Sequence, residues 1–273
     1  MSRPIPAPTT PVLLVGCGRL GSAMVNGWLG TGALDGAGLM IRTPSSRPAV
    51  ERARDAGAAI NPDDDALKQA RTVVLAVKPA LWRQVAAELS PLLAADAVIV
   101  SVMAGVVSSD ISQAFAGRAT ARVMPTTGVA LGRGAASIHA ADPAAAAAAH
   151  ALFDPIAATV ELTDEGMIDA ATGVSGSGQA YVYAFVEALA RAGTAAGLAP
   201  AEAAALARAT LESGAAMLTA DPRPPAELIA EVASPGGTTE AALRVLARPG
   251  GLDDLLRAAV QAAVDRAAEL AGS

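Results

Sequence analysis

Residues 12–21 read Val12-Leu13-Leu14-Val15-Gly16-Cys17-Gly18-Arg19-Leu20-Gly21. Four apolar residues that end at a glycine predict a buried parallel strand, and residues 22–29 predict a helix after it. Three glycines at this spacing, between a strand and a helix, indicate a loop that binds the pyrophosphate of a dinucleotide. In such a loop Gly16 makes the tight turn, Gly18 lets the backbone approach the phosphate, and Gly21 lets the helix pack on the strand. The candidate cofactor-binding residues of the loop are Gly16, Gly18, Arg19, Leu20 and Gly21.

The rest of the first half repeats this alternation of strand and helix. Further strands are expected at 39–42, 72–77, 97–102, 119–124 and 134–139, and helices at 51–56, 81–93 and 109–115. Such alternation predicts right-handed crossovers and a mostly parallel, doubly wound sheet of the Rossmann type.

From about residue 165 onward strand signals fade and helices dominate. We expect helices at 180–196, 200–218, 240–247 and 253–270, with the proline-rich segment 222–235 as a turn. The predicted organisation is a loose leader (1–11), a nucleotide-binding domain (12–164) and an all-helical substrate and dimerisation domain (165–273). Abundant alanine suggests closely packed helices and burial between subunits.

Composition excludes several classes of protein. The chain has 273 residues and no run of 18 apolar ones, so no membrane span is expected. A net charge of −6 and 3% aromatic residues argue against a nucleic-acid partner. One cysteine and two histidines offer neither a disulfide framework nor a metal site. Because the leader has no apolar core like that of a secretion signal, a cytoplasmic location is expected.

The end of the second strand bears on which dinucleotide is bound. An NAD-binding protein usually places a carboxylate there, but this chain has none until Glu51. Arginines and hydroxyls suit a 2′-phosphate, so NADP(H) is the expected cofactor, unless Arg42 and Arg47 are merely solvated charges. The candidate phosphate contacts are Arg42, Thr43, Ser45 and Arg47. The end of the 72–77 strand adds the candidate cofactor contacts Ala76, Val77, Lys78 and Pro79.

Two glycine-rich segments stand out in the helical half. Residues 173–178 read Gly-Val-Ser-Gly-Ser-Gly, and residues 234–239 read Ser-Pro-Gly-Gly-Thr-Thr. We expect both to be loops before helices, with Thr239 as an N-cap. Free N–H groups and hydroxyls at a helix start could hold a small carboxylate. Each segment could equally be a flexible connector.

Taken together and in this order, five motifs resemble the pyrroline-5-carboxylate reductase family over about residues 12–270. They are Gly16–Gly21, Ala76–Pro79, Arg122-Val123-Met124-Pro125, Val174–Gly178 and Ser234–Thr239. The resemblance implies NADPH-dependent reduction of 1-pyrroline-5-carboxylate to L-proline, by a dimer or a ring of dimers with interlocked C-terminal helices.

The resemblance also implies residue roles. Thr239 would hydrogen-bond the ring nitrogen as the catalytic residue, and the backbone N–H groups of Gly237 and Thr238 would hold the carboxylate. The implied substrate-binding set is Ser234, Gly236, Gly237, Thr238 and Thr239. Two positions depart from the family pattern: Thr126 replaces an asparagine and Gln179 replaces a proline. They leave open a related cyclic imine as the substrate.

Three other interpretations remain to be weighed. The similar β-hydroxyacid dehydrogenases carry a catalytic lysine at the position of Val182, and no lysine follows Lys78 in this chain. A non-catalytic NADP-binding regulator would leave Ser234–Thr239 without a purpose. A purely structural helical scaffold would use neither glycine-rich segment.

Overall fold

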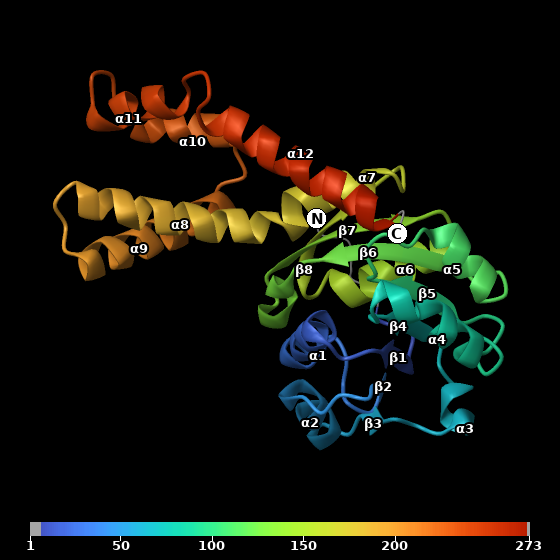
Figure 1. Ribbon diagram of the computed structural model, residues 1–273. Helices are drawn as coiled ribbons and strands as arrows, with labels where there is room; N and C mark the ends of the chain where they lie inside the picture. Colours follow the sequence, from blue (N-terminus) through green and yellow to red (C-terminus); the bar gives the residue numbers. More distant parts are fainter. Residues whose placement is uncertain (1–6, 272–273) are drawn as a thin grey trace. The chain divides into compact units, whose positions relative to one another are not determined.

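The computed structural model describes residues 7–271, and its centre is one eight-stranded sheet (Figure 1). The strands are β1 (Val12–Val15), β2 (Leu39–Arg42), β3 (Ala59–Ile60), β4 (Thr72–Leu75), β5 (Val98–Ser101), β6 (Thr120–Pro125), β7 (Gly134–Ala140) and β8 (Ala157–Glu161). Their order is β3-β2-β1-β4-β5-β6-β7-β8, and every neighbouring pair is parallel except β6 and β7. The predicted doubly wound fold class is confirmed.

Helices cover both faces of this sheet (Figure 1). They are α1 (Arg19–Thr31), α2 (Pro48–Asp55), α3 (Asp64–Leu67), α4 (Trp82–Leu89), α5 (Ser108–Ala114) and α6 (Pro143–Phe153), with short 3₁₀ turns at Pro79–Leu81 and Thr127–Leu131. Helices α1, α2 and α6 bury apolar side chains against one face, and α3, α4 and α5 against the other. Because side chains alternate along each strand, they pack into two cores, one on each side of the sheet.

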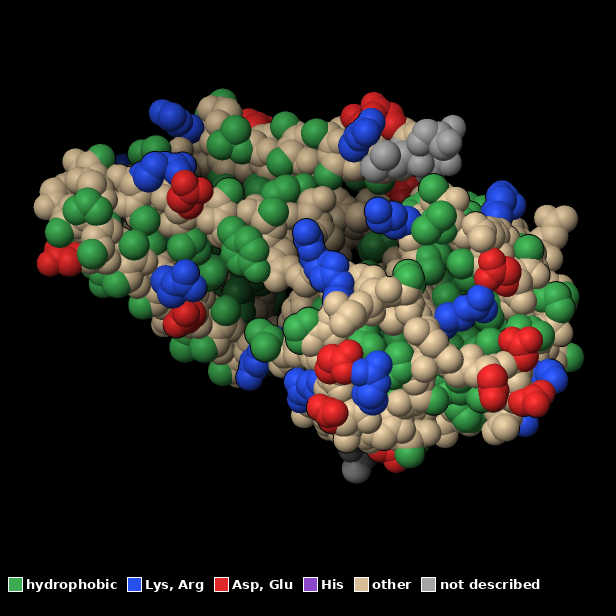
Figure 2. Space-filling view, turned by 60° about the horizontal axis from the view of Figure 1, so that its bottom comes forward, with side chains coloured by type: hydrophobic (Ala, Val, Ile, Leu, Met, Phe, Trp, Pro, Cys, Tyr) green, Lys and Arg blue, Asp and Glu red, His purple; other side chains and the backbone are tan. Residues whose placement is uncertain are grey.

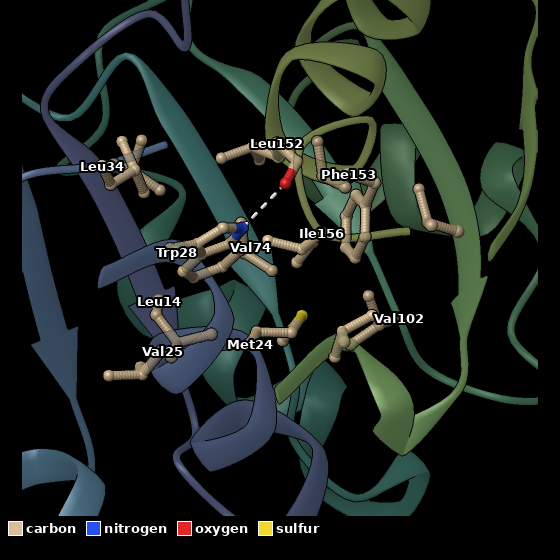
Figure 3. Close-up of a cluster of buried hydrophobic side chains, with 14 of the residues drawn as sticks. Leu14, Met24, Val25, Trp28, Leu34, Val74, Val102, Leu152, Phe153 and Ile156 are labelled. Atoms are coloured by element: carbon tan, nitrogen blue, oxygen red, sulfur yellow. Dashed lines mark hydrogen bonds between the residues drawn. The ribbon is translucent and has the colours of Figure 1, made fainter. Parts of the chain in front are cut away.

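The larger core is built around Trp28 of α1 (Figure 3). The Trp28 ring meets Phe153 edge to face, with ring centroids 6.5 Å apart. Its Nε1 donates to the carbonyl oxygen of Leu152 at 2.8 Å, so the indole is buried without losing its hydrogen bond. This contact anchors α1, the helix that follows the glycine-rich loop, in the core.

The predicted strands agree closely with the structure, while the helices differ more at their ends. Residues 12–15 and 39–42 are strands with the expected bounds, and 134–139 is extended by one residue. The predicted helix at 81–93 starts as a 3₁₀ turn and ends at Leu89. Strands β3 and β8 and helices α3 and α6 were not predicted. The alanine run in α6 has no apolar periodicity, although Asp142 caps it through the backbone N–H groups of Ala144 and Ala145.

The second half is helical, as predicted. Its elements are α7 (Met167–Ala171), a π-helical turn at Thr172–Gly176, α8 (Gly178–Ala195), α9 (Pro200–Ala220), α10 (Pro225–Val232), α11 (Thr238–Leu246) and α12 (Leu252–Ala271). The predicted turn at 222–235 is wrong in part, because α10 occupies its middle. Pro225 stands at the first position of this helix, where proline starts a helix instead of breaking one.

The segment at 173–178 is also not the loop that its glycines suggested. The Thr172 hydroxyl donates to the Ile168 carbonyl at 2.7 Å, and the Ser175 hydroxyl donates to that of Ala171 at 2.9 Å. Both hydroxyls thus bond to a carbonyl four residues earlier, and the backbone through the glycines is helical. The motif is therefore a π-helical turn between α7 and α8.

The chain forms two compact units. One contains the described residues up to Gly176 together with those from Ala263, and the other is Ser177–Ala262. Of the predicted leader, residues 1–6 lie outside the described part. Residues 9–11 run beside β4, where the Thr72 hydroxyl donates to the Thr9 carbonyl at 3.0 Å. Within residues 7–271, no helix has the length and apolar character that crossing a membrane requires.

Candidate functional site

Three segments predicted to hold the cofactor meet at one edge of the sheet. The segments follow β1, β2 and β4, which are parallel neighbours in the order β2-β1-β4. The N–H of Gly16 donates to the Arg42 carbonyl at 2.8 Å, and that of Ala76 donates to Val15 at 2.8 Å. The carboxyl ends of these strands are the place where such sheets bind nucleotides.

Two glycines of the loop are required by packing. Gly16 has φ +92°, and a Cβ there would lie 2.6 Å from the Ala76 carbonyl oxygen. A Cβ on Gly21 would collide with the Gly16 carbonyl oxygen. Only glycine therefore lets the loop turn against β4 and lets α1 begin directly on the loop.

Gly18 differs from both, because a Cβ there would meet nothing within 4 Å. Gly18 is the N-cap of α1, no side chain caps this helix start, and the first turn carries no acid. The first N–H groups of α1 have no acceptor within the helix, and the helix dipole favours an anion at this end. The open space and the free donors fit a phosphate group, and the assignment of the pyrophosphate to this loop stays a prediction.

Cys17 lies inside this loop but does not have the surroundings of a nucleophile. The side chain is 1% exposed, and its Sγ lies 3.6 Å from the Ser22 hydroxyl oxygen. Burial raises the pKa of the Cys17 thiol, against smaller opposing effects of Ser22 and the Arg47 charge. The thiol therefore stays neutral and fills space.

The loop after β2 is ordered by hydrogen bonds that involve an unpredicted residue. Asn61 Oδ1 accepts from the Thr43 N–H at 2.8 Å, and the Thr43 hydroxyl accepts from the Ser45 N–H at 3.2 Å. Thr43 is buried, whereas Ser45 and Arg47 are exposed. Arg47 is the N-cap residue of α2.

Arg42 has a partner that the sequence did not reveal. Its Nη2 lies 2.7 Å from Glu88 Oε2 on α4. Lys78, by contrast, is exposed just after β4, and its carbonyl accepts from the Leu81 N–H at 2.9 Å. The structure thus brings all predicted cofactor residues to one edge and adds a carboxylate to them.

A partly buried ion pair joins β6 to the turn before α7: the side chain of Arg122 is 6% exposed and that of Glu165 is 23% exposed. Arg122 Nη1 is 2.9 Å from Glu165 Oε1, and the two oxygens of Glu165 accept from the Ser108 N–H at 2.6 Å and the Ser108 hydroxyl at 2.7 Å. Burial alone would raise the pKa of Glu165, but these hydrogen bonds and the Arg122 charge outweigh it and lower the pKa. The pair ties the turn before α7 to β6 and to the start of α5.

Thr126, one of the two departures from the family pattern, has a structural partner. Its hydroxyl oxygen accepts from the Ala135 N–H at 3.0 Å, and its own N–H donates to the Ala135 carbonyl at 2.8 Å. Thr126 therefore joins the end of β6 to β7. This bond leaves the hydroxyl proton free to be donated elsewhere.

The Ser234–Thr239 segment lies in the other compact unit, at the start of α11. Thr239 is not the N-cap: Gly237 holds that position, and the carboxylate of Glu240 accepts from the Gly236 N–H at 2.6 Å. The Gly237 N–H donates to the Ser234 carbonyl at 2.9 Å. The N–H groups of Thr238 and Thr239 begin α11 and have no acceptor inside it.

Known proteins resemble the chain along nearly all of its length. Residues 165–270 match the family model described as pyrroline-5-carboxylate reductase dimerisation, and residues 11–105 match one described as NADP oxidoreductase coenzyme F420-dependent. A pyrroline-5-carboxylate reductase of Pisum sativum is 34% identical over 260 residues, which are 94% of this chain and 94% of the relative. The chain belongs to the pyrroline-5-carboxylate reductase family.

Two further members of the pyrroline-5-carboxylate reductase family agree. The relative from Pseudomonas aeruginosa is 34% identical over 272 residues and covers 96% of this chain and 97% of its own. The solved structure from Coxiella burnetii superposes with a TM-score of 0.88 at 29% identity, over 96% of this chain and 98% of that one. The resemblance drawn from five sequence motifs is confirmed. The individual residue roles stay predictions.

Proposed function

We propose that this chain reduces 1-pyrroline-5-carboxylate to L-proline with NADPH, the last step of proline biosynthesis. The observation that carries the proposal is the family match over 94% of the chain. The two family models that match include the Gly16–Gly21 loop and the Ser234–Thr239 segment. The enzyme is an NADP-dependent oxidoreductase that acts on a C=N bond.

NADP(H) is the cofactor, and the first unit supplies its binding site. The glycine-rich loop Gly16–Gly21, called the phosphate loop below, receives the pyrophosphate at the start of α1, next to the open space at Gly18. The β2 loop, with Arg42, Thr43, Ser45 and Arg47, takes the 2′-phosphate. Ala76–Pro79 follow β4 at the same edge of the sheet and complete the wall of this site.

The start of α11 supplies the carboxylate site. The unsatisfied N–H groups of Thr238 and Thr239 and the positive end of the helix dipole suit a small carboxylate. Because the N–H groups of Gly236 and Gly237 already have acceptors, these two glycines shape the turn more than they bind the substrate.

Reduction of a protonated C=N bond requires little general acid–base catalysis from the protein. NADPH, when bound, would supply the hydride for the imine carbon, and the proton on the ring nitrogen would complete the amine. Since a protonated C=N carbon is already electrophilic, alignment supplies much of the rate. The Thr239 hydroxyl would orient the ring nitrogen and would relay to it, from solvent, the one proton that forms the protonated C=N bond.

A related cyclic imine is the second candidate substrate. It is favoured by Thr126, whose hydroxyl is fixed by β7 where the family pattern has an asparagine. Gln179, in the first turn of α8, replaces the proline of the family pattern. Comparison of five- and six-membered cyclic imines with NADPH separates the two candidates.

The enzyme works in the cytoplasm as a homodimer or a ring of dimers. The second unit supports the assembly of several copies, because most of its large apolar side chains are exposed (Figure 2). Among its described residues only Ala203 and Ala207 are buried apolar residues. Exposed examples are Tyr183, Phe185, Met217, Ile229, Val232 and Leu255. So large an apolar surface is typical of an interface between copies.

The test is to incubate the purified chain with NADPH and 1-pyrroline-5-carboxylate, and to follow the nicotinamide absorbance together with L-proline formation. 3-Hydroxyisobutyrate with NADP⁺ is the control for the dehydrogenase alternative, and it should not react. NADPH binding without turnover of any cyclic imine would favour the non-catalytic regulator. Light scattering of the same sample gives the number of copies, and a monomer would contradict the proposed assembly.

A further inference from the structure

Arg42 and Arg47 are the two arginines of the β2 loop, and the structure places them in different electrostatic surroundings. Met40 and Arg42 lie on the same face of β2, and Met40 packs in the core that contains Trp82, Ala86 and Leu89 of α4. Arg42 therefore points toward α4 and meets Glu88, with 2.7 Å between Nη2 and Oε2.

The carboxylate of Glu88 is itself held in place from its own helix. Gln84, one turn earlier on α4, donates from Nε2 to Glu88 Oε1 at 3.1 Å. One oxygen thus faces Gln84 and the other faces Arg42. The side chains of Arg42 and Glu88 are 36% and 44% exposed, so the pair can be reached by a ligand.

Unlike Arg42, Arg47 has no carboxylate partner that offsets its charge in the described part of the chain. It lies at the start of α2, exposed, and close enough to the phosphate loop for its charge to act on the Cys17 thiol. The β2 loop thus presents one open cation and one cation that already has a counter-charge.

We propose that Glu88 is a specificity-determining residue: it competes with the cofactor's 2′-phosphate for Arg42 and so reduces the preference for NADPH over NADH. This inference rests on the proposed function, because it assumes that the β2 loop receives the 2′-phosphate. Phosphate binding must either displace Glu88 or place two anions around one guanidinium, and both cost free energy that NADH does not incur.

The test is the substitution Glu88→Gln, which removes the charge and keeps the size of the side chain. We expect NADPH to bind about two- to fivefold more tightly at low salt, since a half-exposed ion pair contributes up to about 1 kcal/mol. NADH binding should not change. The matched control is Glu269→Gln, which removes the same charge from the exposed pair with Arg266 on α12 and should alter neither affinity.

A second variant tests whether the effect passes through Arg42. In an Arg42→Ala background, Glu88→Gln should no longer change NADPH affinity. Binding is measured by quenching of tryptophan fluorescence, so the result does not depend on turnover. Weaker NADPH binding in Glu88→Gln, equal changes for both cofactors, or an unchanged effect without Arg42 would each overturn the inference. Tight NADPH binding without imine reduction would instead overturn the proposed function alone.

Discussion

Alanine at position 18 should impair cofactor binding without harming the fold. The added methyl group would meet no protein atom within 4 Å, and φ at Gly18 is −73°. The free energy of unfolding should therefore stay within about 0.5 kcal/mol of the wild type. The methyl would occupy the space expected for the pyrophosphate. Loss of one charge-assisted hydrogen bond there costs about 1.5–3 kcal/mol, which corresponds to about ten- to 150-fold weaker NADPH binding.

Gly16→Ala and Gly30→Ala are the matched comparisons. At Gly16 the positive φ costs about 1–2 kcal/mol, and the 2.6 Å contact with the Ala76 oxygen adds about 1–3 kcal/mol of overpacking. This variant should lose both stability and binding. Gly30 is exposed in α1, and a Cβ there meets nothing. Its replacement by alanine should stabilise the chain by up to about 1 kcal/mol and leave binding unchanged.

Urea unfolding gives the stabilities of the three variants, and fluorescence titration gives their NADPH affinities. Wild-type NADPH affinity in Gly18→Ala would show that the pyrophosphate does not lie at this loop. Equal destabilisation of Gly18→Ala and Gly16→Ala would refute the packing argument.

Three other predictions concern the rest of the site. Thr239→Ala should lower kcat by about 100-fold or more and leave NADPH affinity nearly unchanged, because it removes a group that acts on the substrate; an unaffected rate would remove Thr239 from the mechanism. Combined Arg42→Ala and Arg47→Ala should weaken NADPH far more than NADH, and equal losses would mean that the 2′-phosphate binds elsewhere. Glu165→Gln should cost about 1–3 kcal/mol at neutral pH, because it removes the counter-charge of the buried Arg122 at a position that solvent partly screens. Burial acts to raise the pKa of Glu165, but its hydrogen bonds and the Arg122 charge lower that pKa in the folded protein. The stability difference between wild type and Glu165→Gln should therefore be complete above the ordinary glutamate pKa of 4.5. It should disappear as the pH falls through the lower pKa of the folded state. Urea unfolding across pH checks this, and a constant difference down to acid pH would contradict it.

Local signals predicted much of the first unit. Apolar runs bounded by glycine or proline mark β1, β2 and β4, because a strand buried on both faces needs apolar residues throughout. The short edge strand β8 escaped detection because its residues are mostly exposed and form no such run. Helix α6 escaped because alanine gives no contrast between its faces.

Signals in the second half were less decisive because the same residues serve several structures. Gly173 and Gly176 suggested a loop but lie in a π-helical turn, since the hydroxyls of Thr172 and Ser175 bond back along the helix. Thr239 suggested a cap, yet Glu240 binds the turn before it and moves the start of α11 to Thr238. In both segments the choice depended on competition between hydrogen bonds, which residue type alone does not resolve.

By itself the sequence determined the glycine-rich turn between β1 and α1, the alternation of strands and helices, and the family. These features are written in neighbouring residues, because turns, strands and caps are set by backbone conformations over a few positions. Only the tertiary structure decided that Gly16 is closed in by Ala76 while Gly18 is open, and that Glu88 reaches Arg42. Arg42 and Glu88 are 46 positions apart in the chain. Their meeting follows from how β2 and α4 pack against the same face of the sheet, and no local window of sequence encodes that packing.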